Sequence, residues 1–455
     1  MRPARFAAVL MASAALALPL SLGACATTAD MGGEPVAFEA QRLSDHIRTM
    51  SDDRFEGRGI GQDEAGEQLT VAYLIEQFSN AGLAPGGENG GWTQTVTLNR
   101  FEASDIEASL SVGDWTLPVT QGEQVAISTR LPGEEVDLDD AELVFVGYGV
   151  TAPERQWDDF KDMDVRGKIL VVLVNDPDFE QPELDTFGGR AMTYYGRWSY
   201  KYEEAARRGA AGVLVVHEDA PASYGWATVR NSWGGPQFDI VRQNAADERV
   251  PLEAWIQRDV AVDLFRRAGQ DFEALKVAAR SRDFQPVTLD GASMDVSFDV
   301  ATSTIQTDNV IGILRGTTHP DETILYGGHW DHIGVGEPDE SGDGVFNGAV
   351  DNASGMATII EIARRFGAGP RPERSVVFMG FTAEESGLLG AEYGRTRYHQ
   401  AADEWSPTFD YAGMIEDMEI WYEVGHRLAT SRAWPEWRPT SEFVTVRAES
   451  ASARQ

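Results

Sequence analysis

The feature that most constrains this 455-residue chain is the alternation of strand-like and helix-like segments after Thr304. Residues 309–314, 323–327 and 375–381 are short, continuously apolar runs of the kind that forms buried strands. Between them, residues 354–366 place apolar side chains at helical spacing. This alternation predicts an α/β fold: a mixed, mostly parallel sheet flanked by helices, with ligands bound at the carboxyl ends of the strands.

Two regions of different character precede this one. Residues 37–82 predict two helices, the first with a face of Leu43, Ile47 and Met50, the second with a face of Leu69, Ala72, Tyr73 and Phe78. Residues 101–286 instead contain short β-rich runs separated by glycine turns. We therefore predict a discontinuous domain, residues 39–125 and 295–455, interrupted by a β-rich module over residues 126–290. The module shows no ionisable cluster in its sequence, so we expect it to act as a lid or substrate-access element.

Three polar motifs follow the predicted elements of the last region: GGHWDH at 327–332, NGAVDNASG at 347–355 and FTAEESG at 381–387. Each has an ordinary explanation when taken alone. His329 suits a hydrogen-bonded structural histidine, Asp351 suits a turn or helix cap, and adjacent glutamates suit a solvated turn. Because the motifs occur in order, each after an apolar strand or at the start of a helix, together they predict a metal site.

The chemistry of these residues fits metal-assisted hydrolysis. The imidazole of His329 can bind a metal ion, and a nearby carboxylate such as Asp331 can fix its orientation. Asp351 lies where a carboxylate could bridge two cations. Glu384 and Glu385 are adjacent at a strand end and point in different directions, so one can bind metal while the other acts as a base on water.

The three motifs resemble those of metallopeptidase family 28, which contains bacterial di-zinc aminopeptidases and relatives of glutamate carboxypeptidase. The resemblance extends to FEGR at 55–58 and to the inserted module, which is similar to a protease-associated domain. It implies a zinc-dependent exopeptidase of the aminopeptidase type, acting on peptide substrates. It also implies site roles: zinc ligands His329, Asp351 and Glu385, with Asp351 bridging two ions; general base Glu384; and Asp331 orienting His329.

The family pattern also requires an aspartate and a histidine on later loops, and neither motif occurs here. The chain after Tyr398 instead resembles the C-terminal end of family members. We therefore predict an internal deletion between about residues 392 and 397 that removes both ligands. The later candidates to replace them are His399, Asp403, Asp417 and His426. The residues around Asp417 predict the polar side of an amphipathic helix, which argues against that replacement.

An incomplete ligand set leaves two other functions open. The chain could be a catalytically inactive homologue that binds peptides or a protein partner through the inserted module. It could also be a damaged product that folds poorly, because losing strands exposes sheet edges and apolar surface.

The N-terminus predicts export. A basic start and an apolar run over residues 6–22 precede LGAC at 22–25, which ends in the chain's single cysteine. This resembles a bacterial lipoprotein signal, which implies removal of residues 1–24, lipidation of Cys25 and a tether over residues 25–38. A plain signal peptide with an incidental cysteine is the alternative. We expect a protein lipid-anchored at the cell envelope, in the periplasm or at the outer membrane.

The charge balance excludes one class of function. Lysine and arginine number 38 against 73 aspartates and glutamates, a net charge of −35. Such a surface repels nucleic acid, so we expect no nucleic-acid partner. The same charge serves solubility or favours cationic substrates, and the sequence leaves these alternatives and the oligomeric state open.

Overall fold

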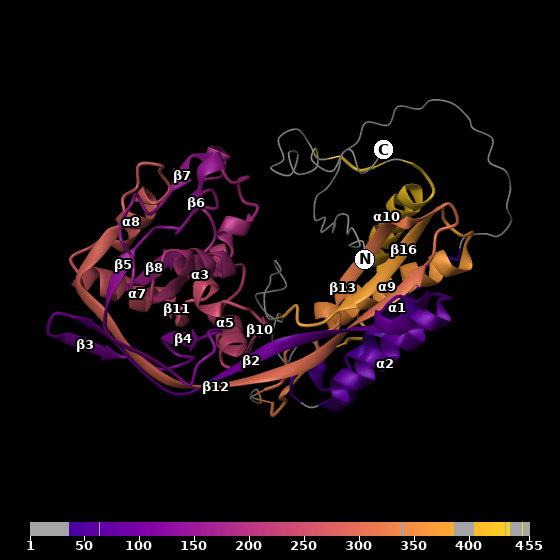
Figure 1. Ribbon diagram of the computed structural model, residues 1–455, viewed down its shortest axis with the longest axis horizontal. Coiled ribbons are helices and arrows are strands. Elements are labelled where there is room, and N and C mark those ends of the chain that lie inside the picture. The colour runs from indigo at the N-terminus through magenta and orange to yellow at the C-terminus, as the bar shows by residue number, and fades with distance from the viewer. Residues whose placement is uncertain are drawn as a thin grey trace.

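Two lobes that share one sheet make up the protein (Figure 1). The insertion lobe comprises the chain between the long strands β2 (Thr93–Val112) and β12 (Val287–Leu314), and the main lobe comprises the chain before and after them. The structure is a computed structural model. It describes residues 36–62, 64–336, 338, 341–385, 405–432, 434–436 and 448. Residues 1–24, Cys25 and the predicted deletion at about 392–397 lie outside these ranges.

The predicted helices of the main lobe are confirmed, with one change of face. They are α1 (Ala40–Met50), α2 (Glu64–Asn80), α9 (Gly355–Ala368) and α10 (Ala412–Ala429). On α1 the predicted face is buried. On α2 the predicted face is confirmed at Phe78, which is buried, and wrong at Leu69 and Ala72, which are exposed; Tyr73 is half-buried. Thr70 and Leu74 complete the buried row. The reason is that Gly66 heads this row one turn earlier and packs so closely on Phe55 that a Cβ would lie 2.3 Å from its carbonyl oxygen.

The insertion lobe is richer in helix than its sequence suggests. Its helices are α3 (Trp198–Arg207), α4 (Asp219–Ala222), α5 (Trp226–Trp233), α6 (Ala245–Glu248), α7 (Arg258–Arg267) and α8 (Phe272–Ala278). Its strands are β3 (Trp115–Pro118), β4 (Val125–Ser128), β5 (Glu135–Phe145), β6 (Thr151–Ala152), β7 (Trp157–Asp158), β8 (Ile169–Leu173), β9 (Gly212–His217), β10 (Gln237–Ile240) and β11 (Leu252–Gln257).

Twelve of the described strands form one mixed sheet, in the order β10-β2-β12-β5-β8-β9-β11-β4, with β1, β3, β13 and β16 paired alongside, and the other four form two separate pairs. The remaining strands are β1 (Ala84–Pro85), β13 (His319–His329), β14 (Gly334–Val335), β15 (Val345–Phe346) and β16 (Arg374–Phe381). A mixed sheet flanked by helices is the fold that the sequence predicts. Antiparallel pairs are nevertheless more numerous than parallel ones, because β2, β12 and their neighbours pair antiparallel.

The two long strands form a twisted ribbon that runs through both lobes (Figure 1). Their pairing shifts register between Ser297 and Asp299, where β2 contains one extra residue next to Asp105. Asp105 has a positive φ of 53°, which marks a β-bulge. The lobes are therefore joined by continuous hydrogen-bonded strands.

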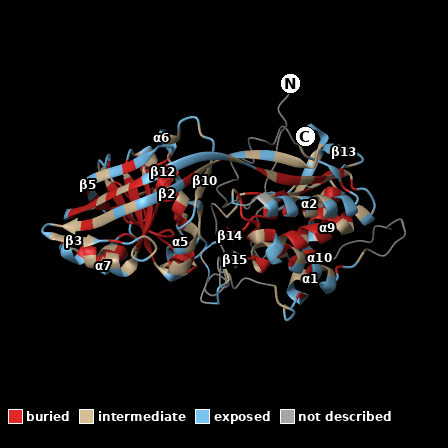
Figure 2. Cartoon of the chain, turned by 90° about the horizontal axis from the view of Figure 1, so that it is seen from below, coloured by how far each residue is buried: buried red, intermediate tan, exposed pale blue. Residues whose placement is uncertain are grey.

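Helices cover both faces of the inner strands of the insertion lobe, and buried residues, red in Figure 2, gather in the interior of that lobe. Side chains such as Phe145 and Val171 point into a core with α7 and α8, while their neighbours Val144 and Val172 point into a second core with α3 and α5. Alternate residues of one strand are thus buried on opposite sides, as a near-continuous apolar run requires.

Among the described residues, the main lobe covers only one face of its sheet to this extent. Val310, Val376 and Phe378 lie in a core with α1, α2 and α9. The opposite face carries six half-buried apolar side chains that belong to none of the three cores of the described residues. These are Ile311, Ile313, Leu325, Val377, Met379 and Phe381, and we call them the open face. Within the described residues, β13 is also paired on one edge alone, to β16.

No helix in the described part of the chain combines the length and apolar composition needed to cross a membrane.

Candidate metal centre

Two adjacent parallel strands bring the first and third polar motifs together. In the pairing of β13 with β16, His329 lies opposite Phe381, so both strands end at the same level. The amide of Trp330 then donates a hydrogen bond to the Phe381 carbonyl oxygen (2.9 Å), and its buried indole donates to the Asp308 carbonyl oxygen (3.0 Å). The buried Trp330 therefore anchors the loop that follows His329.

The second motif approaches the same point from the start of α9. Asp351 lies in the segment Ala349–Ser354, directly before that helix, and its own backbone is not helical (φ −108°, ψ 99°). The side-chain amide of Asn352 donates to the His329 carbonyl oxygen (3.3 Å), and its oxygen accepts from the Gly355 amide (3.1 Å). The peptide bond between Asp351 and Asn352 is cis. Asn352 thus ties the Asp351 turn to the end of β13.

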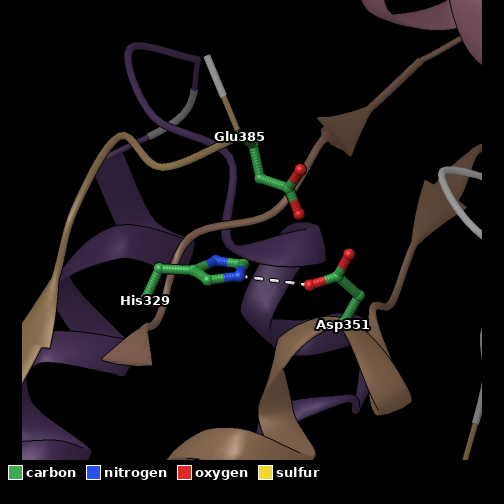
Figure 3. Close-up of side chains that lie close together, drawn as sticks. All are labelled: His329, Asp351 and Glu385. Carbon is green, nitrogen blue, oxygen red and sulfur yellow. Dashed lines mark ion pairs between the residues drawn. The ribbon is translucent and has the colours of Figure 1, made fainter. Parts of the chain in front are cut away.

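The three predicted metal ligands converge. One nitrogen or oxygen atom from each of His329, Asp351 and Glu385 lies within 4.8 Å of the others, and the three side chains point toward a common centre (Figure 3). His329 Nε2 is 3.2 Å from Asp351 Oδ1 and 3.5 Å from Glu384 Oε2. All three ligand residues are partly exposed in the part of the chain that the structure describes.

The chemistry and spacing of this group fit zinc. An imidazole nitrogen and carboxylate oxygens are ordinary zinc ligands in proteins. Two ligands of a tetrahedral ion with bonds of about 2.0 Å lie about 3.3 Å apart. The 3.2 Å between His329 Nε2 and Asp351 Oδ1 is close to that separation. The residues present can therefore hold one zinc ion.

The carboxylate of Asp331 makes other contacts than the expected one with His329. Its buried carboxylate accepts hydrogen bonds from the amides of Glu384 (3.0 Å) and Glu385 (3.1 Å). His329 Nδ1 is nearer to the Asp331 carbonyl oxygen (3.1 Å) than to its carboxylate (3.7 Å). The Asp331 side chain therefore holds the two-glutamate turn, while its backbone faces the imidazole.

His332 is a site residue to which sequence reasoning gave no role. It is buried, and its Nδ1 lies 2.6 Å from Glu385 Oε1. This contact fixes the carboxylate of a predicted ligand, as outer-shell partners of metal sites do. The signal was available, because His332 stands one residue after Asp331 in the same motif.

The electrostatics of the group are dominated by burial and by clustered carboxylates. Burial opposes a charged imidazole, but Asp351 and the other acidic neighbours outweigh it and raise the pKa of His329 to about 10. Burial raises the pKa of Asp331 to about 6 and that of Glu384 to about 8, against the opposing charge of His329. Crowded carboxylates of this kind are stabilised by a nearby cation.

The insertion lobe reaches this centre through Arg197, at the start of α3. Burial lowers the pKa of Arg197, and the charge of Glu384 raises it. Its Nη1 is buried without a hydrogen-bond partner among the described residues. A basic residue of the inserted segment is thus within electrostatic range of the site. Sequence reasoning missed Arg197 because it lies in none of the three polar motifs.

The later candidate ligands do not join the group where the structure describes them. Asp417 is exposed on α10, as its predicted position on the polar side of a helix requires. His426 stacks on Tyr422, one turn earlier on the same helix. His399 and Asp403 lie outside the described residues.

Part of the chain that includes the metal group is similar to known peptidases. Residues 309–410 match the model of Peptidase family M28. A probable zinc metalloprotease of Pyrenophora teres f. teres is 42% identical over 93 residues, covering 20% of this chain and 19% of that protein. Aminopeptidase NAALADL1 of Mus musculus is 35% identical over 106 residues, covering 22% of this chain and 13% of its own length. The chain thus matches about a fifth or less of the length of these relatives.

Among solved structures, an aminopeptidase from Aneurinibacillus sp. strain AM-1 aligns with a TM-score of 0.41 and 20% identity, over 77% of this chain and 64% of that one. The family resemblance drawn from the three motifs is confirmed over residues 309–410, which include all five predicted site residues. The individual roles of His329, Asp331, Asp351, Glu384 and Glu385 stay predictions.

Proposed function

We propose that this chain is a zinc-dependent exopeptidase of the aminopeptidase type. One observation supports this above the others: His329, Asp351 and Glu385 converge at the ends of parallel strands, with the Glu384 carboxylate 3.5 Å from His329 Nε2. The segment that contains them matches a peptidase family, and the names of the similar proteins refer to zinc metalloproteases and aminopeptidases.

Each residue has a distinct part in the proposed reaction. His329, Asp351 and Glu385 would hold the metal, and His332 fixes Glu385. Zinc supplies Lewis acidity, which polarises a carbonyl group and makes water a stronger acid. Glu384 takes a proton from the attacking water and delivers it to the nitrogen of the departing amine. Asp331 keeps Glu384 in place through its backbone amide.

A first experiment measures zinc per chain, together with hydrolysis of aminoacyl-4-nitroanilides by the signal-free protein. The proposal predicts at least one zinc and activity that a chelator removes. Glu384→Gln should retain the zinc and lose about 10²- to 10⁴-fold in rate, the usual contribution of a general base. His329→Ala should lose the zinc. Asp417→Asn, on exposed α10, is the matched control and should change neither.

The outcomes separate the alternatives. A folded protein without zinc and without activity contradicts the proposal and supports the inactive homologue that binds peptides or a partner. Zinc without hydrolysis of these substrates contradicts the aminopeptidase activity and leaves the metal site intact. Two zinc ions per chain would mean that residues beyond the three described ligands complete a second site, and that the predicted loss of two ligands is wrong.

We also propose that the protein is exported and lipid-anchored through Cys25, with residues 126–290 serving as a protease-associated module. The support is the signal-like N-terminus and the position of the single cysteine. Radiolabelled palmitate should label the wild-type protein and leave Cys25→Ser unlabelled and released from membranes. Equal labelling of both proteins, or of neither, contradicts the anchor.

A further inference from the structure

Arg58 connects two segments that carry the metal group, although it lies in the first helical region of the chain. It ends the short helical turn η1 (Asp53–Arg58), and its side chain is fully buried. Its guanidinium donates to the carbonyl oxygens of Trp330 (2.8 Å), Asn347 (2.6 Å), Gly348 (2.8 Å) and Met50 (2.7 Å). A longer contact of 3.5 Å reaches the Asp351 carbonyl oxygen.

These acceptors are placed next to the predicted ligands. Trp330 directly follows His329, and Gly348 begins the turn that presents Asp351. The backbone of Arg58 adds a further contact, because its carbonyl oxygen accepts from the amide of His332 (3.2 Å). His332 in turn holds Glu385. One residue is thus bonded directly to the segments of His329 and Asp351, and it reaches Glu385 through His332.

The side chain of Arg58 and the backbone at Gly348 are tightly packed. A Cβ at Gly348 would lie 2.6 Å from Arg58 Nη2 and 2.3 Å from the Asp351 carbonyl oxygen. Gly348 also has a positive φ of 57°, which favours glycine. The guanidinium therefore packs directly against the backbone of the Asp351 turn, and a change in either one moves the other.

Only arginine can make this set of bonds. Its planar group carries five N–H donors in a fixed geometry, whereas lysine offers three from a single atom. Burying a cation carries a desolvation cost, which the carbonyl dipoles here offset. A residue that served only to fill space at this position would not need a charge.

We infer that Arg58 is a positioning residue for metal binding, which sets the separation of His329 and Asp351 by clamping the backbone on either side. The inference rests on the proposed zinc site and assigns its affinity to a residue from the N-terminal part of the chain. Losing such an outer partner weakens metal binding about 10- to 100-fold in comparable sites.

The test is the zinc affinity of Arg58→Lys, measured by competition with a chromogenic chelator on the otherwise complete protein. The expected loss is about 10- to 100-fold. Arg374→Lys is the matched control: Arg374 is also buried in the main lobe, and it donates to Glu322 (2.6 Å) and to the Leu428 carbonyl oxygen (2.6 Å). That variant should unfold more easily but bind zinc like the wild type.

Two further measurements keep the inference falsifiable. The visible spectrum of the cobalt-substituted protein should change in Arg58→Lys and stay unchanged in Arg374→Lys, because only the first alters ligand geometry. Gly348→Ala, which presses on the same contact, should weaken zinc binding even if Arg58→Lys does not fold.

Wild-type zinc affinity in both Arg58→Lys and Gly348→Ala would overturn the role of Arg58 while leaving the zinc site intact. Absence of zinc from the wild-type protein would overturn the proposed function itself, and this inference with it.

Discussion

The two lobes build the same kind of strand into different surroundings. In the insertion lobe, β8 is buried along its whole length, between a core with α7 and α8 on one face and a core with α3 and α5 on the other. In the main lobe, β16 is also apolar after Ser375, but alternate residues Val377, Met379 and Phe381 remain half-buried on the open face. A continuous run of apolar residues therefore predicts that a strand needs cover on both faces. It does not identify the elements that cover each face.

The difference has a consequence for the metal centre. His329, Glu384 and Glu385 follow strands of the main lobe, at the less covered end of the sheet. Hydrogen bonds from Arg58, Trp330 and Asp331 help to place their segments. We expect perturbations of the open face to matter less for stability than matched perturbations in the insertion lobe.

The largest expected contrast concerns two phenylalanines. Phe145 is fully buried and makes edge contacts with Phe265 and Phe284, whereas Phe381 is half-buried on the open face. Phe145→Ala should lower the free energy of unfolding by about 3–5 kcal/mol because it leaves a cavity. Phe381→Ala should cost well under half as much. The urea midpoint of each variant measures this, and equal losses would contradict the contrast.

Acid should weaken the main lobe through Glu361. Burial opposes ionisation of Glu361, but hydrogen bonds from His46, Arg42 and Arg364 lower its pKa to about 2. The folded state keeps Glu361 ionised down to a lower pH than the unfolded state does, so this carboxylate stabilises the fold at pH values above about 4.5. That stability is lost as pH falls from about 4.5 to about 2. The loss is up to about 3 kcal/mol by linkage.

Asp159 in the insertion lobe provides the opposite sign. Burial raises the pKa of Asp159 to about 7, so the folded state keeps a proton that the unfolded state releases. This contribution is largest below the ordinary pKa and is lost as pH rises toward about 7. Glu361→Gln should flatten the acid-side fall in urea midpoint and Asp159→Asn should not. An unchanged acid response in Glu361→Gln would remove this distinction between the lobes.

The smallest expected effect tests the open face directly. Val172 on β8 is buried in a core, whereas Val377 on β16 is half-buried on the open face. Val172→Thr should cost about 1–3 kcal/mol, because it buries a hydroxyl group. Val377→Thr should change the free energy of unfolding by less than about 0.5 kcal/mol, as surface substitutions do. A cost at Val377 equal to that at Val172 would mean that the open face is covered in solution.

The sequence predicted the parts of the fold that depend on local patterns. The strands over 309–314, 323–327 and 375–381 and the helix at 354–366 form as expected, since apolar period and glycine turns are local signals. It did not reveal that β2 and β12 are single long strands, because polar residues interrupt their pattern. The buried row of α2 was missed at Thr70 and Leu74 for a related reason: it starts at Gly66, which has no side chain to show a pattern.

The candidate site divides in the same way. The five predicted residues gather because each follows a recognisable strand or opens a helix. The sequence did not place Arg58 and Arg197 at the site, because both belong to segments far from the three motifs. They act on the site through contacts that only the folded chain creates.

The bulge in β2 accommodates one extra residue without turning the strand over. Before it, Phe101 and Ala103 point toward the core of the insertion lobe, and after it Ala108 and Leu110 do so, although the numbering has passed from odd to even. Removing Asp105 alone would leave one residue opposite Phe298 and give a regular pair, with every later side chain of β2 still on its present face. Removing two residues there would instead reverse the alternation. Evolution can therefore change the length of this strand by one residue at the bulge, whereas a change of one residue elsewhere turns the side chains beyond it to the other face unless a second change compensates.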